Sequence, residues 1–340
     1  MYASQDRVLG WPRPAAIVMK LSNESPYPAY LFRTGIDEHR IFASVVVRVT
    51  HDIVDGRLRP AAAQPWAVSA GEWVGPHGPM PGDHIPYRSG VDVLVFGSAR
   101  AYGGRPVPCV EVAVEIGARW RGRVLAFGDR TWRRGVTGLV PSDPDPVLAV
   151  PLTLARAYGG CDEWDGLQVP FVDNPAGRGF YLESSRAHGK LLPNLEDPDD
   201  LIRAWDDRPE PVGTTPCAQT FGPRVRRGLE LDEDQQTITR IDPRFFNDAF
   251  PGMVAPVVAP GDTVVVRGVR EDGPLTFTLP EPPVRVDIRV GDDGGVRTPA
   301  IDQIGVDADA RSVYLSYRFP FRYVLIPHRL RHCRLLAASN

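Results

Sequence analysis

Apolar and polar residues alternate along several segments of the chain, and this pattern predicts β-strands. In the segments 109–116, 284–290 and 313–319, every second residue is apolar and the residues between are mostly polar. A period of two places the apolar residues on one face of a strand, as in antiparallel sheets with one face toward solvent. The segments 91–97 and 263–269 are more uniformly apolar, so we expect them to be central strands.

Turn residues separate the predicted strands. An Asp-Gly pair stands at 55–56, a Gly-Gly pair at 103–104 and an Asp-Asp-Gly-Gly run at 292–295. These residues readily adopt the positive φ angles that tight hairpins require. The sequence therefore predicts consecutive hairpins over 90–128 and again over 263–319.

Helical patterns are few and short. The segment 197–205 has an acidic first turn, which suits a helix N-terminus. In the segment 242–250, Asp242 is a candidate N-cap and Pro243 would occupy the first helical position. The basic segment 325–336 is faintly amphipathic, and both a short helix and a tail fit it. We expect less than about 15 % helix overall.

The predicted fold class is mainly β, with two closely packed antiparallel β-rich halves, sandwich-like, a long loop-rich middle segment and few short helices. The chain has 35 prolines and 33 glycines among 340 residues, which favours many turns between short strands. The expected organisation is an N-terminal arm, one domain of three parts (β-rich, loop-rich, β-rich) and a basic C-terminal tail, with these boundaries: 1–19, 20–140, 141–260, 261–325 and 326–340.

Composition narrows the classes of partner. The formal net charge is −3, so no basic surplus indicates a nucleic-acid partner. No apolar run approaches the length of a membrane span, and no secretory signal is visible, so we expect no membrane insertion and a cytoplasmic location. The four cysteines are widely spaced, which is typical of free thiols. No phosphate-binding or dinucleotide motif occurs, and we predict no cofactor.

Two groups of histidines are candidate metal ligands. His77, Asp83 and His84 lie in one proline-rich stretch, and His328 and His332 stand four residues apart near the C-terminus. Spacing alone is weak support for a metal site, and arginines surround the second pair. The sequence therefore predicts no metal site.

The segment 174–198 carries the residues that most resemble catalytic groups. Glu183 and Glu196 would serve a glycosidase if the loop brought them together, and Ser184 or Ser185 with His188 would serve a hydrolase. The glycine-rich context argues against the helix that would join a serine to His188.

A structural interpretation of this segment explains more of its residues. Arg178 stands between Gly177 and Gly179, and its guanidinium offers several donors in a rigid fork. Asn194 is suited to bond neighbouring backbone groups. We predict that the segment is scaffold with an outer docking surface, that Arg178 holds it through several hydrogen bonds, and that it contains no catalytic residue.

An ordered set of short motifs resembles the bacterial domain-of-unknown-function 2169 family. These motifs include GVDVLVFGSA, VLAFGDRTW, LARAYGG, NPAGRGF, LPNLEDP, RPEPVG and DPRFFNDAF, and the likeness covers about residues 20–320. One departure concerns Phe221, which precedes Pro223-Arg224 where the family usually has a tryptophan. The resemblance places the following residues in family motifs with a structural or partner-binding role: Gly128, Asp129, Arg130, Trp132, Asn174, Pro175, Gly177, Arg178, Gly179, Phe180, Pro193, Asn194, Glu196, Pro198, Phe245 and Phe246.

The resemblance also implies a function. Members are typically encoded beside type VI secretion components and look like adaptors or chaperones for effectors with a PAAR-type tip or of the Rhs type. It therefore implies a non-enzymatic protein that binds a secreted effector, a PAAR protein or a spike protein. Two alternatives stay open: a carbohydrate-active or other hydrolase using the carboxylates or His188 of 174–198, and a structural subunit of the spike.

Overall fold

The computed structural model describes residues 19–136, 138–234, 236–325 and 329–338. The N-terminal arm expected over 1–19 therefore lies, apart from Met19, outside the described residues. Strands account for 48 % of the structure and helices for 8 %. These values confirm a mainly β protein with little helix.

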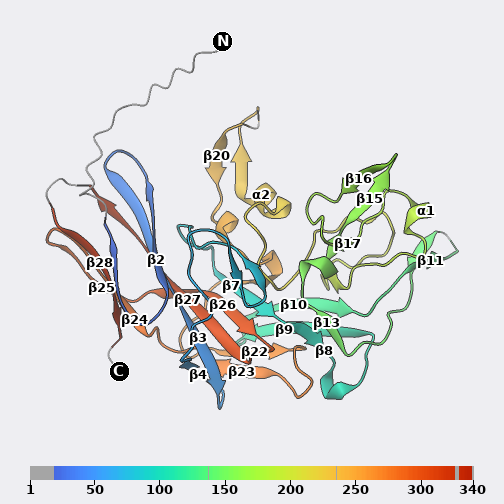
Figure 1. Ribbon diagram of the computed structural model, residues 1–340, viewed down its shortest axis with the longest axis horizontal. Coiled ribbons are helices and arrows are strands. Elements are labelled where there is room, and N and C mark those ends of the chain that lie inside the picture. The colour runs from blue at the N-terminus through green and yellow to red at the C-terminus, as the bar shows by residue number, and fades with distance from the viewer. Residues whose placement is uncertain (1–18, 137, 235, 326–328, 339–340) are drawn as a thin grey trace, which may run out of the picture.

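The largest sheet in the described part of the chain has twelve strands and crosses the centre of the molecule (Figure 1). Its order along the sheet is β18 (Leu195–Glu196), β10 (Trp120–Phe127), β9 (Cys109–Ile116), β22 (Thr263–Arg267), β23 (Leu275–Thr278), β4 (Arg57–Pro60), β3 (Arg40–Val54), β27 (Ser312–Val324), β26 (Ala300–Asp307), β7 (Val91–Phe96) and β21 (Val254–Ala255), and β2 (Ala29–Gly35) pairs with β3.

Strands from the two expected β-rich halves alternate within this main sheet. The β22–β23 hairpin lies between β9 and β4, and β27 and β26 lie between β3 and β7. The two halves are therefore held together because their strands pair with each other in one sheet. Most pairs are antiparallel, but β26 and β7 run parallel over Gln303–Asp307 and Asp92–Phe96.

A second sheet combines both ends of the described chain. It consists of β1 (Leu21–Glu24), β28 (Arg331–Ala337), β24 (Val284–Val290) and β25 (Asp293–Arg297). The C-terminal segment is therefore a strand over 331–337, and both expectations for it, a short helix or a tail, are wrong there. The reason is a period of two: Cys333 and Leu335 are buried, whereas His332, Arg334 and Leu336 are partly exposed.

The hairpin predictions were correct for some neighbours and wrong for others. β9–β10, β22–β23, β24–β25 and β26–β27 are antiparallel neighbours. The pair at 55–56 joins β3 to β4 with positive φ at both residues. The pair at 103–104 does not join β7 to β9, because β7 is buried along its whole length and lies between β26 and β21. The strand after it, β8 (Ser98–Arg100), pairs instead with β13 (Ala149–Pro151).

The helices are α1 (Ser184–Ala187), α2 (Gly222–Gly228) and the 3-10 turns η1 (Tyr102–Gly104), η2 (Leu154–Arg156), η3 (Pro243–Phe246) and η4 (Pro251–Met253). Asp242 caps η3 as predicted, because its carboxylate accepts the Arg244 N–H. The helix expected over 197–205 is absent, and the segment forms turns instead. Its acidic residues cap those turns: the Asp197 carboxylate accepts the Asp199 N–H at 2.8 Å.

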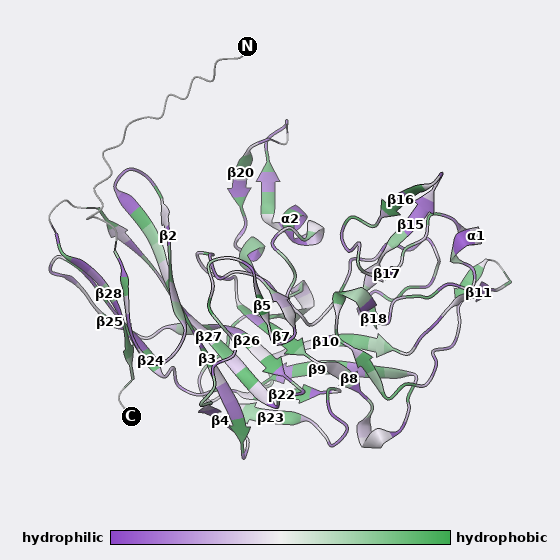
Figure 2. Ribbon diagram, viewed as in Figure 1, coloured by the Kyte–Doolittle hydropathy of each residue, from purple (hydrophilic) through white to green (hydrophobic). Residues whose placement is uncertain are grey.

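The loop-rich middle of the chain builds a separate projection, which we call the middle lobe and define as residues 129–210 (Figure 1). Its elements are β11 (Trp132–Arg134), β12 (Leu139–Pro141), β13, η2, β14 (Tyr158–Gly159), β15 (Cys161–Trp164), β16 (Leu167–Pro170), β17 (Arg178–Gly179), α1 and β18. Figure 2 shows hydrophobic residues concentrated on strands of the main sheet and again on β16, at the outer end of the lobe.

The remaining elements are the hairpins β5 (Trp73–Gly75) with β6 (Gly78–Met80) and β19 (Leu229–Leu231) with β20 (Ile238–Ile241). Of the helices formed by the described residues, none is long and apolar enough to cross a membrane.

Candidate functional site

The motif residues from 128–132, 174–180 and 193–198 come together inside the middle lobe. Arg130 and Glu196 form an ion pair, and both side chains are buried. The same guanidinium donates to the Pro193 carbonyl at 3.0 Å, and the Glu196 carboxylate accepts the Ile202 N–H at 3.0 Å. These contacts connect residues that are distant in sequence, next to the place where β18 pairs with β10.

The environment of Glu196 suits a structural carboxylate. Burial raises the pKa of Glu196 above its usual value, and the Arg130 guanidinium opposes this shift. Arg130 also stacks over the Phe127 ring, with 4.1 Å between the guanidinium carbon and the ring centroid. The carboxylate is enclosed, so a substrate would need the lobe to open before reaching it.

Asn174 closes the glycine-rich turn of the lobe. Its Nδ2 donates to the Leu154 and Tyr158 carbonyls at 2.8 and 3.0 Å. Its own carbonyl accepts the N–H groups of Gly160 and Gly177 at 2.8 and 3.1 Å. A Cβ added at Gly159 would collide with this carbonyl, which explains why the backbone here needs glycine.

Asn194 performs a similar task on the other side of the lobe. Its Nδ2 donates to the Phe127 carbonyl at 2.9 Å and to Asp129 Oδ1 at 3.0 Å. Its Oδ1 accepts from Arg156 Nη1 at 3.3 Å. Next to this network, a Cβ at Gly128 would collide with the Asp145 carbonyl. The asparagine side chain therefore provides hydrogen-bond partners for the connecting backbone, and the glycine lets two backbone segments approach closely.

Arg178 does not hold the loop through several side-chain hydrogen bonds, so that prediction is wrong. Within the described residues its side chain makes one ion pair, from Nη1 to Asp129 Oδ1 at 3.4 Å, while Nε and Nη2 are buried without an acceptor. Burial lowers the pKa of Arg178, and nearby Arg156 adds to this. The contribution of Arg178 to the fold is through its backbone, whose N–H donates to the Ala157 carbonyl at 3.0 Å.

The other motif residues surround a small apolar core. Trp132 packs with Tyr158, Ala187, Leu192 and Ile202, and Phe180 lies at its edge. The prolines shape its surroundings. Pro193 packs against Gly179, the Pro175 carbonyl accepts the Cys161 thiol at 3.7 Å, and Pro198 lies in the turn bridged by Asp197 and Asp200.

The expected catalytic candidates occupy different environments. Glu183, Ser184, Ser185 and His188 are exposed on α1 and at its ends, whereas Glu196 is buried. The helix that the sequence argued against does form, as one turn in which the His188 N–H donates to the Ser184 carbonyl. Ser185 Oγ donates to Glu183 at 3.2 Å. Across the described ranges, no side-chain hydrogen bond joins either serine to His188.

The outer end of the lobe exposes large apolar side chains. Trp164 and Leu167 stand opposite each other beside the turn of the β15–β16 hairpin, and they are 53 % and 69 % exposed. Asp165 and Gly166 form the turn, with φ of 49° and 76°. Val172, which follows β16, is 82 % exposed. The lobe therefore presents an apolar surface on a structure that its motif residues hold from inside.

The described members of the two histidine groups lie in separate contacts. His77 pairs with Asp307 at 2.9 Å, Asp83 with Arg48 at 2.7 Å, and His84 Nδ1 with the Tyr30 hydroxyl at 2.7 Å. Thus the three neighbours in sequence serve separate contacts. His332 pairs with Asp287 at 3.2 Å, and His328 lies outside the described residues. In the part of the chain that the structure describes, no group of three His, Cys, Asp or Glu residues is placed to hold a metal ion.

A buried network of arginines and aspartates lies within the main sheet, and the sequence analysis missed it. At its centre Arg88 donates to Asp92 at 2.9 Å, to Asp302 at 2.8 Å and to Asp248. Arg318 also donates to Asp302, at 2.6 Å, and Arg224 to Asp248, at 3.1 Å. These contacts connect β7, β26 and β27 with the segment after η3.

The network left no signal in the sequence. Its partners are up to 214 positions apart, and each arginine or aspartate looks ordinary in its own segment.

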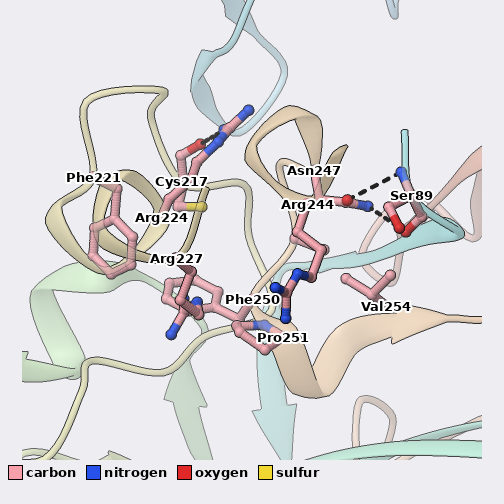
Figure 3. A pocket seen from close by; sticks show the side chains of 11 residues that line it. Ser89, Cys217, Phe221, Arg224, Arg227, Arg244, Asn247, Phe250, Pro251 and Val254 are labelled. Carbon is pink, nitrogen blue, oxygen red and sulfur yellow. Dashed lines mark hydrogen bonds between the residues drawn. The ribbon is translucent and has the colours of Figure 1, made fainter. Parts of the chain in front are cut away.

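A cavity of about 250 Å³ lies beside this network, between α2 and the 243–254 segment (Figure 3). Its apolar lining includes Phe221, Phe250, Pro251 and Val254. Phe221 meets Phe250 edge to face with 5.4 Å between ring centroids. The arginines at the cavity are engaged elsewhere: Arg224 with Asp248, Arg227 with Glu210 and Arg244 with Asp242.

The cavity suits an apolar group better than nucleophilic chemistry. Burial raises the pKa of the Cys217 thiol to about 12, so it stays protonated at neutral pH. In Figure 3 the Arg224 side chain points toward the Cys217 carbonyl, and Asn247 points toward Ser89. Of the motif residues near α2, Phe245 packs on Gly228 and Phe246 packs on Tyr87.

Comparison with known proteins identifies one family. The profile of the domain-of-unknown-function 2169 family, described as an uncharacterized protein conserved in bacteria, matches residues 38–318. No curated protein and no solved structure matches the chain.

Proposed function

The chain belongs to the bacterial domain-of-unknown-function 2169 family, and from this premise we propose that it is a non-enzymatic adaptor or chaperone for a secreted effector. The effector would be a type VI secretion substrate of the PAAR or Rhs type, bound in the cytoplasm and delivered to the secretion spike. The motif resemblance supports this role, and several of its motifs, among them NPAGRGF and LPNLEDP, build the middle lobe.

One observation carries the proposal: the exposed apolar surface on the β15–β16 hairpin. Trp164 is more than half exposed and stands beside Leu167 at the tip. Large exposed apolar patches commonly mark protein–protein contacts, and tryptophan is the residue most enriched among those that dominate binding energy. This surface is therefore the candidate contact for the effector or the spike.

The hairpin is also held in a fixed position, which favours docking. The Phe171 N–H donates to the Gly160 carbonyl at 2.8 Å and closes the base of the hairpin. Asp162 on β15 accepts the Leu182 N–H at 2.9 Å and pairs with Arg186 at 3.5 Å. A surface that is already ordered loses less entropy on binding than a flexible one.

The test begins with co-expression of the chain and the secreted effector from its neighbouring gene, followed by capture through a tag on either protein. Trp164→Ala should weaken the complex at least about tenfold, because truncating a central aromatic contact commonly costs that much. Tyr102→Ala is the matched control, since Tyr102 is also an exposed aromatic residue but lies on η1, outside the middle lobe.

A deletion strain provides the second readout. Loss of the gene should reduce the stability or export of that effector while other spike cargo still leaves the cell. If no complex forms and export is unchanged in the deletion strain, the proposed function is wrong.

A further inference from the structure

The strand β27 continues beyond one of its two neighbours. It pairs with β3 along its whole length, from Ser312 opposite Asp52 to Val324 opposite Arg40. It pairs with β26 only from Ser312 to Arg318. On that side, no strand of the described residues pairs with β27 after Arg318, so the segment 319–324 has an open edge.

The direction of the backbone groups on this edge follows from the pairing with β3. In an antiparallel pair, alternate residues direct their N–H and C=O groups toward the partner. The Leu325 N–H donates to the His39 carbonyl at 2.7 Å, so the odd-numbered residues face β3. Arg322 and Val324 therefore direct their N–H groups toward the open edge.

Pro320 agrees with this assignment. Proline cannot donate to a strand ladder and is confined within sheets to positions whose nitrogen faces no partner. Pro320 lies within β27 at an even-numbered position, two residues after Arg318, the last residue that pairs with β26.

A groove of about 400 Å³ lies along this open edge, a size within the common range of ligand sites, roughly 300–1,000 Å³. One wall is the segment Phe321–Val324 of β27, and the other is the β24–β25 hairpin of the second sheet. Ile288, Val290 and Phe321 give it an apolar floor. In the described chain β25 is the last strand of its sheet, so a second open strand edge borders the same groove.

The charges at the groove favour an acidic occupant. Arg297 and Arg322 line it and are exposed. Among the described side chains, no carboxylate lies within ion-pair distance of either guanidinium. Asp293 is the opposing charge in the lining. A segment with acidic side chains would therefore complete the electrostatics of this site.

We propose that this groove binds an extended segment of the partner protein, with alternating apolar and acidic residues, as an additional strand along the 319–324 edge of β27. Strand addition of this kind obtains affinity from backbone hydrogen bonds and specificity from pockets for alternate side chains. The inference rests on the proposed function and adds a second contact to it. The groove lies at the β24–β25 end of the molecule, opposite the middle lobe (Figure 1), so the same partner would contact the adaptor at both ends.

The first measurement is hydrogen exchange of the full-length protein, alone and in complex with the neighbouring effector. The amides of Arg322 and Val324 should exchange at least about tenfold more slowly in the complex, because a new strand would engage them. The same measurement with a short acetylated peptide of alternating valine and glutamate tests the groove without the effector.

Two sets of variants test the edge and the charge. Val324→Pro removes an outward N–H and should weaken the complex roughly tenfold, whereas Val324→Thr keeps the N–H and the branched side chain and should bind normally. The pair Arg297→Glu and Arg322→Glu, combined, should also weaken binding at least about tenfold. Arg59→Glu is its control, because Arg59 is an exposed strand arginine away from the groove.

The outcomes separate this inference from the proposed function. A complex that forms with unchanged exchange at Arg322 and Val324, and with neutral variants, overturns the groove and leaves the adaptor role standing. If no complex forms and effector export is unchanged, the adaptor role fails, and the peptide decides: slowed exchange supports the groove and unchanged exchange overturns it. Protection at these amides in a dimer of the protein alone would make the occupant a second copy and overturn the inference.

Discussion

The main sheet and the middle lobe satisfy their backbone groups in different ways. In the main sheet the N–H and C=O groups pair between strands, as in the 13-residue strand β27 between β3 and β26. In the lobe the strands are short, and side chains supply part of the pairing: Asn174 donates to the Leu154 and Tyr158 carbonyls, and Asn194 donates to the Phe127 carbonyl. The lobe thus depends on particular side chains where the sheet depends on strand pairing.

The apolar cores of the main sheet and the lobe also differ in size. The sheets enclose a long continuous core that includes Val93, Ile304 and Leu315. The lobe has a small core around Trp132 and Leu192. Because burial of apolar area is the main source of stability, we expect the lobe to open locally before the sheet unfolds.

The buried ion pairs of the two regions also differ in how much of the chain they connect. The network around Arg88 joins strands and loops from distant parts of the sequence, whereas Arg130 and Glu196 join two segments of the lobe. Removing a charge from the network should therefore destabilise the whole protein, and removing one from the lobe should act locally. Substitutions in the two regions test this difference.

Arg88→Met should have the largest effect. It leaves Asp92, Asp248 and Asp302 without the guanidinium that neutralises them, and the side chain of Arg88 is only 1 % exposed. We expect a loss of about 5 kcal/mol in the free energy of unfolding, measured by urea denaturation. If the variant does not fold, Arg88→Lys, which keeps the charge but loses the fork, should fold with an intermediate loss.

The control for this change is Arg240→Met. Arg240 and Glu230 form an exposed pair on the β19–β20 hairpin, and such pairs contribute less than about 1 kcal/mol. An equal loss for Arg88→Met and Arg240→Met would contradict a stabilising role for the network.

Arg130→Met should have the next largest effect, but confined to the lobe. Glu196 would remain buried without its partner, at a cost of about 4 kcal/mol. Hydrogen exchange should accelerate at Leu192 and Ile202 while Val93 and Leu315 in the sheet stay protected. Arg123→Met is the matched control, because Arg123 of β10 makes an exposed pair with Asp199 of the lobe. Faster exchange throughout the sheet would show that the two regions unfold together.

The sequence predicted the structural features that depend on residues close together in the chain. Alternation located β9, β24 and β27, because burying one face of a strand imposes a period of two on its own residues. It did not predict that β22 lies beside β9 or that β27 lies between β3 and β26, since the choice of neighbour depends on residues far away in the chain.

The same limit applies to the candidate site. Gly177, Gly179 and Asn194 indicated a folded loop through their local backbone chemistry, and the lobe has that loop. The choice of Arg178 as its main anchor was wrong, because which arginine meets which carboxylate depends on tertiary distance: Arg130 and Glu196 are 66 positions apart. The Arg88 network could not be predicted for the same reason.

Gly159→Ala tests the glycines of the lobe and should have a smaller effect than Arg130→Met. Its φ of 146° is unfavourable for alanine, and the new Cβ would collide with the Asn174 carbonyl. We expect a local loss of about 3 kcal/mol, again read from exchange at Leu192. Gly166→Ala is the control: it also has a positive φ, of 76°, but its Cβ would meet open space, so its loss should be limited to backbone strain. Equal losses for the two variants would mean that the close approach to Asn174 contributes nothing.

The smallest expected effect comes from an Arg–Asp pair that lies at the surface instead of inside the sheet. The Arg244 side chain and backbone N–H bond the Asp242 carboxylate and lower its pKa to about 2, from an ordinary value of 3.8. Because the folded pKa is the lower one, this stabilisation is complete above pH 3.8 and is lost as the pH falls through about 2. Asp242→Asn keeps an N-cap acceptor but removes the charge, so it should lower thermal stability slightly at pH 7, and its difference from the unmodified protein should disappear toward pH 2. Asp242→Ala removes the cap as well and should cost about 1 kcal/mol. A loss at pH 7 as large as that of Arg88→Met would mean that burial does not decide what an Arg–Asp pair contributes in this protein.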